Sequence, residues 1–338
     1  MSKRQIIEEI RKKNERLPEH FFHGSSQLSK LELLALYLDP DMQAARSLVV
    51  IGAASCIEVS VKEAIKQLVD FGSPFIDRVD QFKEPIKFDL ALTRALSERL
   101  ITFGDLVSHS LSVSNIGQIA SHFEVLFSKE HSIRFGQLLA SLRAHVDPTD
   151  DEVLGGEIDQ DRRDRSPLLV VDVEGLMSSI ARLFELRHLG AHEASFELVT
   201  TEELTHLLSK ARHFIDVLYE LVEQTLRPGA TRSSFGASIE AMAKAGEIRN
   251  RADALMQDIK EVVRIRLGEA SDVLSSICES EQNFQAFADA EVSLRIKLYS
   301  VVTGNALRNV ESFVLTKIWG ARERYLIGLA QDVKGCLE

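Results

Sequence analysis

Residues 39–72 read D-P-D-M-Q-A-A-R-S-L-V-V-I-G-A-A-S-C-I-E-V-S-V-K-E-A-I-K-Q-L-V-D-F-G, and this stretch decides the fold. Asp39 suits the N-cap of a helix, and Pro40 suits its first turn, where the missing N–H donor does no harm. The run from Asp41 to Phe71 is apolar through its middle, and Gly72 suits a C-cap. A helix that is apolar on all sides is buried. The sequence therefore predicts a long core helix around which other helices pack.

The composition favours an all-α fold. Of 338 residues, 45% are hydrophobic and 27% are charged, which is ordinary for a chain that folds around a core. Seven prolines and 7% aromatic residues, with abundant leucine, alanine, glutamate and arginine, favour helices. The formal net charge of -11 repels polyanions, so any contact with RNA must come from a local basic cleft.

We expect a cytoplasmic protein with no membrane contact. The most apolar run, 48–61, contains Glu58 and is too short to span a bilayer. The first residues, M-S-K-R-Q-I-I-E-E, lack the apolar core of a signal peptide. No metal ion and no cofactor are expected either, because the cysteines are scattered without the spacing of metal ligands. The cysteines are Cys56, Cys278 and Cys336.

The rest of the chain predicts shorter helices in two domains. We place the first domain at 1–230, with an insertion at about 73–166, and a C-terminal helical domain at 231–338. Thr200 and Glu203 form a capping-box pattern before a strongly amphipathic helix. The other helices of the first domain are expected at 2–16, 28–38, 89–101, 115–127, 133–145 and 173–188.

The stretch 147–167 is expected to be a loop, because it combines Gly155-Gly156 with dense charge. It holds the densest basic cluster of the chain, which consists of Arg162, Arg163 and Arg165. Two interpretations stand. These arginines pair with neighbouring aspartates on a solvated loop, or they contact RNA.

Beyond residue 231, apolar residues recur at alternating spacings of four and three, which is a heptad seam. Such a seam forms one face of a helical hairpin, which we favour at this length, or an intermolecular coiled coil. Two further helices are expected at 288–302 and 306–333. The seam consists of Ala241, Ala245, Ile248, Ala252, Leu255, Ile259 and Val262.

A short motif, F-E-L-R-H-L-G-A-H-E-A at residues 184–194, carries the best indication of function. It places Arg187, His188 and His192 at the end of the helix predicted at 173–188, where the backbone can turn side chains into a groove. Arginine is a permanent cation with a planar fork of donors suited to phosphate. Histidine exchanges protons near neutral pH. These groups are the minimum set for cutting RNA without a metal.

The motif and its context resemble the HEPN superfamily, whose helical-bundle domains carry an arginine, a polar residue, a few further residues and a histidine. The long apolar helix comes first, then an amphipathic helix that runs into R-H-L-G-A-H, a short irregular stretch, and a capped helix that begins T-T-E-E-L. The resemblance covers about 28–227, with 73–166 as an elaboration, and leaves out the C-terminal third. The polar residue, often asparagine in the family, is His188 here.

Many HEPN proteins are metal-independent ribonucleases of toxin–antitoxin and phage-defence systems. The resemblance implies that His192 is the general base that deprotonates a ribose 2′-hydroxyl, so that cleavage leaves a 2′,3′-cyclic phosphate and a 5′-hydroxyl. Arg187 would hold the phosphate, and His188 would polarise the leaving oxygen or orient the phosphate. In the family two motifs meet across a two-fold axis, which implies a homodimer with RNA as substrate. An antitoxin or regulatory protein is a further expected partner.

Three charged residues could support the motif. Glu58 and Lys62 lie one turn apart on the long helix, either as a surface ion pair or, as in some HEPN enzymes, facing the motif. Glu193 is expected to pair locally with Arg187 or His188.

Rival catalytic motifs are missing from the sequence: it has no Walker-type glycine loop, no His-Glu-x-x-His and no Gly-x-Ser-x-Gly. Two alternatives to a nuclease stay open. One is a non-catalytic helical protein that binds a partner through the heptad seam. The other is a HEPN-like nucleotide-binding or regulatory subunit that works with a separate enzyme.

Overall fold

The computed structural model describes residues 3–16, 22–39, 41–82, 89–128, 133–155, 159–196, 199–298 and 304–337. The described residues form helices and no strands, with a single isolated bridge between Arg143 and Leu168, so the all-α prediction is confirmed. None of the described helices is both long enough and apolar enough to cross a membrane.

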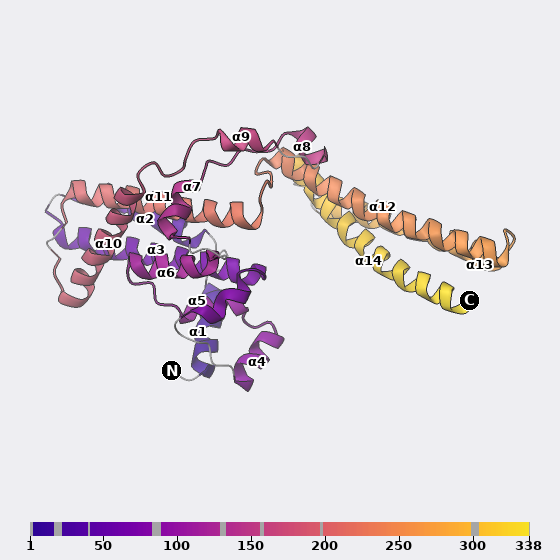
Figure 1. Ribbon diagram of the computed structural model, residues 1–338, viewed down its shortest axis with the longest axis horizontal. Helices are drawn as coiled ribbons and strands as arrows, with labels where there is room; N and C mark the ends of the chain where they lie inside the picture. The colour runs from indigo at the N-terminus through magenta and orange to yellow at the C-terminus, as the bar shows by residue number, and fades with distance from the viewer. Residues whose placement is uncertain are drawn as a thin grey trace. The chain divides into compact units, whose positions relative to one another are not determined.

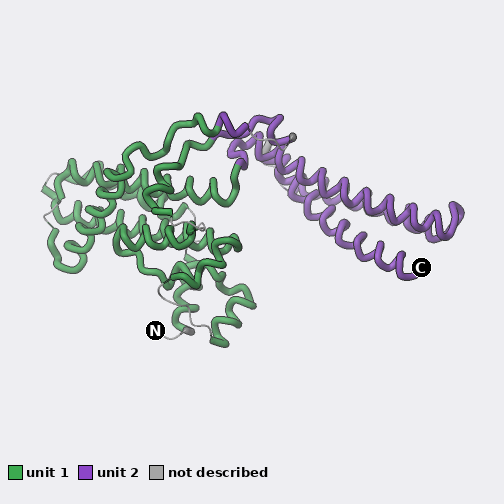
Figure 2. Tube along the Cα trace, in the orientation of Figure 1, with its two compact units in different colours: residues 1–145, 163–228 green, residues 146–162, 229–338 purple. Residues whose placement is uncertain are grey.

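Two compact units make up the chain (Figure 2). Unit 1 comprises Met1–His145 with Arg163–Pro228, and unit 2 comprises Val146–Arg162 with Gly229–Glu338. The division after Pro228 falls close to the expected boundary at 230. Residues 146–162, however, were expected inside the first domain and belong to unit 2.

Unit 1 is a bundle of helices around a long central one (Figure 1). Among its described residues, unit 2 contains one short helix and three long ones. The helices of unit 1 are α1 (Lys3–Arg16), α2 (His23–Ala35), α3 (Gln43–Phe71), the 3-10 helix η1 (Ile76–Gln81), α4 (Leu90–Ser97), α5 (Phe103–Ser110), α6 (Ile116–Phe127), α7 (Phe135–Ser141), α10 (Val173–Glu193) and α11 (Thr201–Leu226). Those of unit 2 are α8 (Asp150–Gly155), α12 (Ser234–Leu267), α13 (Asp272–Leu298) and α14 (Asn305–Leu337), and α9 (Gln160–Asp164) spans the point of division.

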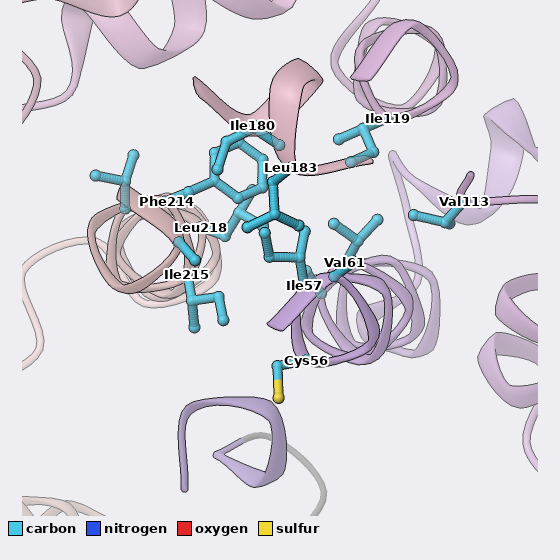
Figure 3. Close-up of a cluster of buried hydrophobic side chains, with 14 of the residues drawn as sticks. Cys56, Ile57, Val61, Val113, Ile119, Ile180, Leu183, Phe214, Ile215 and Leu218 are labelled. Carbon is cyan, nitrogen blue, oxygen red and sulfur yellow. The ribbon is translucent and has the colours of Figure 1, made fainter. Parts of the chain in front are cut away.

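The central helix of unit 1 is α3, which packs against α2, α5, α10 and α11. Figure 3 shows Ile57 of α3 meeting Leu183 of α10 and Leu218 of α11 in the core. Burial of such aliphatic side chains supplies most of the stabilisation, about 1.5–3 kcal/mol for each. The helix begins later than expected, with Met42 at its N-cap, and Pro40 lies outside the described residues.

The burial of α3 is less complete than its composition indicates. Leu48 keeps 59% of its surface exposed, and Ser55 is exposed two turns further on. Both positions lie on one stripe of the helix, because residues seven apart share a face. One stripe of α3 therefore faces solvent, although most of the helix is in the core.

Polar side chains fasten the outer helices to this core. Arg212 of α11 donates from Nη2 to Oε2 of Glu32 on α2 at 2.7 Å, and from Nη1 to the backbone oxygen of Ser25 at 3.1 Å. The Tyr219 and Ser60 hydroxyls lie 3.3 Å apart, which joins α11 to α3. These bonds link segments far apart in sequence.

The helix α5 was not expected, because the sequence indicated a gap between 101 and 115. Its capping box has the Thr102 hydroxyl accepting from the Asp105 N–H at 3.0 Å, and the Asp105 carboxylate accepting from the Thr102 N–H at 2.9 Å. Asp70 at the end of α3 accepts from the Gly104 N–H at 2.7 Å. This close approach requires glycine: a Cβ at residue 104 would lie 2.7 Å from the Asp70 carboxyl carbon.

The stretch 147–167 is also more ordered than the loop that was expected. It forms α8 and α9, with residues 156–158 outside the described part. Glu152 explains the order: its carboxylate accepts from the N–H groups of Thr149 and Asp159 and from Arg162. The two backbone bonds, followed by the side chains of Thr149 and Arg162, outweigh burial and lower the pKa of Glu152 to about 2.

Unit 2 forms its own core from α12, α13 and α14. The seam expected along α12 is largely present, and it packs against α13 and α14 of the same chain, as in a helical hairpin. A helix was expected at 288–302, but α13 already begins at Asp272, and residues 299–303 lie outside the described part. The buried residues of this core are Ala252, Met256, Ile259, Val263, Leu274, Ile277, Trp319 and Leu326.

Replacing Gly104 by alanine tests the contact between α5 and α3. The added Cβ meets backbone and carboxylate atoms that cannot move aside, so the free energy of unfolding should fall by about 1–3 kcal/mol. The matched control is Gly136→Ala in α7, whose Cβ meets only the Val173 side chain at 3.7 Å. Urea denaturation measures both, and equal stabilities of the two variants would show that the contact is not tight.

Candidate functional site

The motif at 184–194 occupies about the last three turns of α10, and Ala194 is the C-cap. The Asp172 carboxylate caps the helix start by accepting from the Gly175 N–H at 2.8 Å. The helix was expected to stop at His188, but it continues to Glu193 and ends where Ala194 adopts a left-handed conformation with φ 51°. Arg187, His188 and His192 are therefore all helical.

This extension separates the predicted catalytic pair. Residues five apart on a helix point about 140° away from each other, so Arg187 and His192 lie on different faces of α10. His188 and His192 are one turn apart, and their rings lie side by side with centroids 4.9 Å apart at 47°. Both histidines are exposed. The structure thus places the two imidazoles side by side, whereas Arg187 and His192 lie on different faces of the helix.

Arg187 turns towards α3, where Glu58 holds it. The distance from Arg187 Nη2 to Glu58 Oε2 is 3.3 Å, and the other Glu58 oxygen lies 3.1 Å from Lys62 Nζ. Glu58 and Lys62 thus form an i,i+4 ion pair, and Glu58 also contacts Arg187 of the motif. The two alternatives considered for these residues, an ion pair and a position facing the motif, are therefore both present. One carboxylate serves two cations, and all three side chains are only 22–29% exposed.

The position of Arg187 depends on close packing between α10 and α3. A Cβ at Gly190 would lie 3.1 Å from the Ile51 side chain, so the missing side chain lets the two helices approach. Buried Arg46 donates to the backbone oxygen of Val199 at 2.9 Å, and the Ser47 hydroxyl donates to that of Phe196 at 2.8 Å. These bonds fasten the segment after the motif to α3.

Glu193 does not take the place expected for it. Arg187 pairs with Glu58 instead, and no ion pair joins Glu193 to His188 in the described structure. The reason is the helical phase: residues five and six apart do not face each other, whereas those three and four apart do.

A polar pocket of about 280 Å³ opens beside Glu58 and was not foreseen. Its walls come from α1, α3 and α5, which are distant in sequence. The Thr102-x-x-Asp105 pattern was the one local signal for α5. The lining residues are Ile10, Lys13, Ser55, Glu58, Val59, Lys62, Asp105, Ser108 and His109.

Charge in this pocket is balanced by pairing. Lys13 lies 2.9 Å from buried Glu63, and Lys66 lies 2.6 Å from Asp105. Burial alone raises the pKa of Asp105, but bonds from Lys66, the Thr102 N–H and Asn14 outweigh it and leave that pKa below its ordinary value.

The His109 ring lies at the edge of the same pocket. Its pKa is lowered first by burial and then by the ammonium groups of Lys62 and Lys13, while Glu9 at 3.6 Å opposes the shift. The ring is therefore neutral at pH 7. The folded state binds a proton here less readily than the unfolded chain, so this group weakens the fold as pH falls through about 6.5.

The predicted basic cluster is divided between the two units. Arg162 belongs to unit 2, where its guanidinium lies 2.6 Å from Glu152 and 3.2 Å from the backbone oxygen of Asp147. Arg163 and Arg165 belong to unit 1. The pairing expected for these arginines is thus present at Arg162, with glutamate in place of aspartate.

In the described part of the chain, no group of three or more histidine, cysteine or carboxylate side chains is placed to hold a metal ion. Comparison with family models, curated proteins and solved structures gives no significant match. The assignment of a function therefore depends on the geometry of the motif and on the resemblance of its sequence.

Replacing Lys62 by glutamine should raise the pKa of His109 towards its ordinary value, because one of the two ammonium groups that oppose its protonation is lost. Histidine ring signals followed by NMR from pH 4 to 9 report this shift, with His109→Asn to assign the signal. Lys30→Gln, an exposed change on α2, serves as the control. An unchanged pKa in Lys62→Gln would show that Lys62 does not contribute to the shift.

Proposed function

We propose that this chain is a metal-independent endoribonuclease of the toxin or phage-defence type that acts as a homodimer. The observation that carries the proposal is the pair of exposed imidazoles, His188 and His192, with ring centroids 4.9 Å apart beside Arg187. When the 2′-hydroxyl of RNA attacks the adjacent phosphate, one group must accept the proton of that hydroxyl and another must donate a proton to the leaving oxygen. Two neighbouring histidines supply both.

The proposed reaction is a transfer within the RNA. His192 accepts the proton of a ribose 2′-hydroxyl while that oxygen forms a bond to the adjacent phosphorus. The bond from phosphorus to the 5′ oxygen of the next nucleotide breaks, and His188 gives this oxygen a proton. The products are a 2′,3′-cyclic phosphate and a 5′-hydroxyl. No oxidant, reductant or water is consumed in this step.

Arg187 completes the site across a dimer. It points about 140° away from His192 around α10, so one copy does not present both groups to the same phosphate. In the proposed dimer, His192 of one copy deprotonates the ribose 2′-hydroxyl, and Arg187 of the other copy neutralises the phosphate that this oxygen attacks, as the HEPN resemblance implies. Glu58 holds the guanidinium in a fixed direction, which lowers the cost of ordering it on binding.

The acidic character of the chain fits a local site. A net charge of -11 keeps non-specific binding to RNA weak. A two-fold arrangement doubles the number of positive groups at one place without changing the charge of the rest of the surface. We therefore expect RNA cleavage to fall steeply as salt rises.

Cleavage of single-stranded RNA in EDTA tests the proposal. His192→Ala and His188→Ala should each lower the rate on the order of 10²–10⁴-fold, the usual contribution of a general acid or base. Arg187→Ala should lower it by a comparable factor. His206→Ala is the matched control, because His206 is an exposed histidine on the neighbouring helix α11. Product ends are identified by mass spectrometry.

Cleavage that stops in EDTA, or that survives in all three motif variants, contradicts the mechanism. A folded dimer that cleaves no RNA under any condition favours the non-catalytic interaction protein instead.

Mixing two inactive variants tests whether the site is shared between copies. In a mixture of Arg187→Ala and His192→Ala, half of the dimers carry one of each, and each mixed dimer has one intact composite site. Activity should therefore return to about a quarter of the wild-type level. If Arg187 and His192 act within one copy, mixing restores nothing.

A further inference from the structure

Unit 2 contains a hollow of about 420 Å³ between α12 and α13, with α14 beneath it. Its volume lies within the usual range of about 300–1,000 Å³ for small-molecule sites. The floor is formed by side chains that are buried or nearly so: Ala252, Met256, Trp319 and Leu326. The walls carry amide and charged groups, namely Arg249, Asp253, Gln257, Glu281, Gln282, Gln285 and Arg322.

The charges around this hollow leave one cation without a carboxylate. Arg249 Nε lies 3.6 Å from Asp253, and Lys260 pairs with Glu281. Both carboxylates of the hollow are thus already engaged. Arg322 is the third cation, and the one hydrogen bond that its side chain makes in the described structure is a long one of 3.5 Å to Ser280 Oγ.

Aromatic rings hold Arg322 in place. Its guanidinium carbon lies 4.7 Å from the centre of the Phe284 ring and 5.3 Å from that of Tyr325. Burial lowers the pKa of this guanidinium, and neighbouring Tyr325 and Glu281 offset the effect only in part. A half-buried, pre-oriented guanidinium without a carboxylate is suited to bind an anion, above all a phosphate.

The rest of the hollow is suited to a planar heterocycle. The buried Trp319 ring forms part of its floor, with the Arg249 guanidinium over it at 5.2 Å and Phe284 edge-on at 5.0 Å between ring centroids. Gln257 and Gln282 each offer a donor and an acceptor, the pair of groups by which glutamine recognises the edge of a nucleobase, whereas the Gln285 amide nitrogen already donates to Asp289 at 3.0 Å. The half-exposed guanidinium plane of Arg249, which lies over Trp319, offers a surface on which any base can stack.

We propose that this hollow binds a nucleoside monophosphate, with the phosphate on Arg322 and the base against the Arg249 guanidinium over Trp319 and against the glutamine amides. The phosphate of the ligand would pair with Arg322, because both carboxylates of the hollow are already engaged by other cations. The site lies wholly within unit 2, so this proposal is independent of the nuclease proposed for unit 1.

The chain provides its own probe, because Trp319 is its single tryptophan. The full-length protein is titrated with AMP, GMP, CMP and UMP, and tryptophan fluorescence and calorimetry follow binding. A saturable change in fluorescence is expected with at least one of them. Adenosine lacks the phosphate and should bind at least tenfold more weakly than AMP. Inorganic phosphate lacks the base and should bind at least tenfold more weakly than the nucleotide that binds best.

Arg322→Gln should weaken nucleotide binding at least tenfold. Arg324→Gln is the matched control, because Arg324 is exposed on the same helix and does not line the hollow. Gln282→Ala, a change at an exposed residue, should also weaken nucleotide binding. It provides the test if the Arg322→Gln protein does not fold. The proposal is overturned if no nucleotide binds at up to about 1 mM. It is also overturned if adenosine binds as well as AMP, or if a folded Arg322→Gln protein binds like the wild type.

Discussion

The packing of α10 against α3 is the contact on which the rest of unit 1 depends. Gly190 removes the side chain that would keep the two helices apart at Ile51, and the apolar face of α10 is then buried against α3. The same approach brings Arg187 within reach of Glu58. A contact in the core therefore sets the direction in which Arg187 points, because a helix is rigid and each of its side chains leaves the axis at a fixed angle.

Ion pairing dominates the electrostatics of this acidic chain. Glu58 engages two cations, and buried Glu63 and Asp105 each engage a lysine. Half-buried pairs of this kind are costly to break, since removing one partner leaves the other charge desolvated. The exposed imidazoles of unit 1 and Arg322 of unit 2 have no carboxylate partner among the ion pairs of the described residues, whereas Arg187 keeps its pairing with Glu58.

Much of the fold could be predicted because its signals are local or periodic. The core helix, the Asp172 and Thr200 caps and the seam of α12 follow from residues within one or two turns of each other. By contrast, α5 was missed although Thr102 and Asp105 form a local capping box at its start, and its packing depends on Asp70, far away in the chain. The end of α10 was misplaced because Gly190 favours a stop in isolation, whereas packing against Ile51 carries the helix through it.

By itself, the sequence determined that the chain is helical, that one helix is mostly core, and that Arg187, His188 and His192 lie close together along the chain. Only the tertiary structure decided which of them share a face. The two histidines do, because they are one turn apart on a helix that continues to Glu193. Arg187 and His192 do not share a face, because they lie five residues apart on the helix, which rotates their side chains away from each other. The spacing of two residues in a sequence does not say which way their side chains point until the backbone conformation is known.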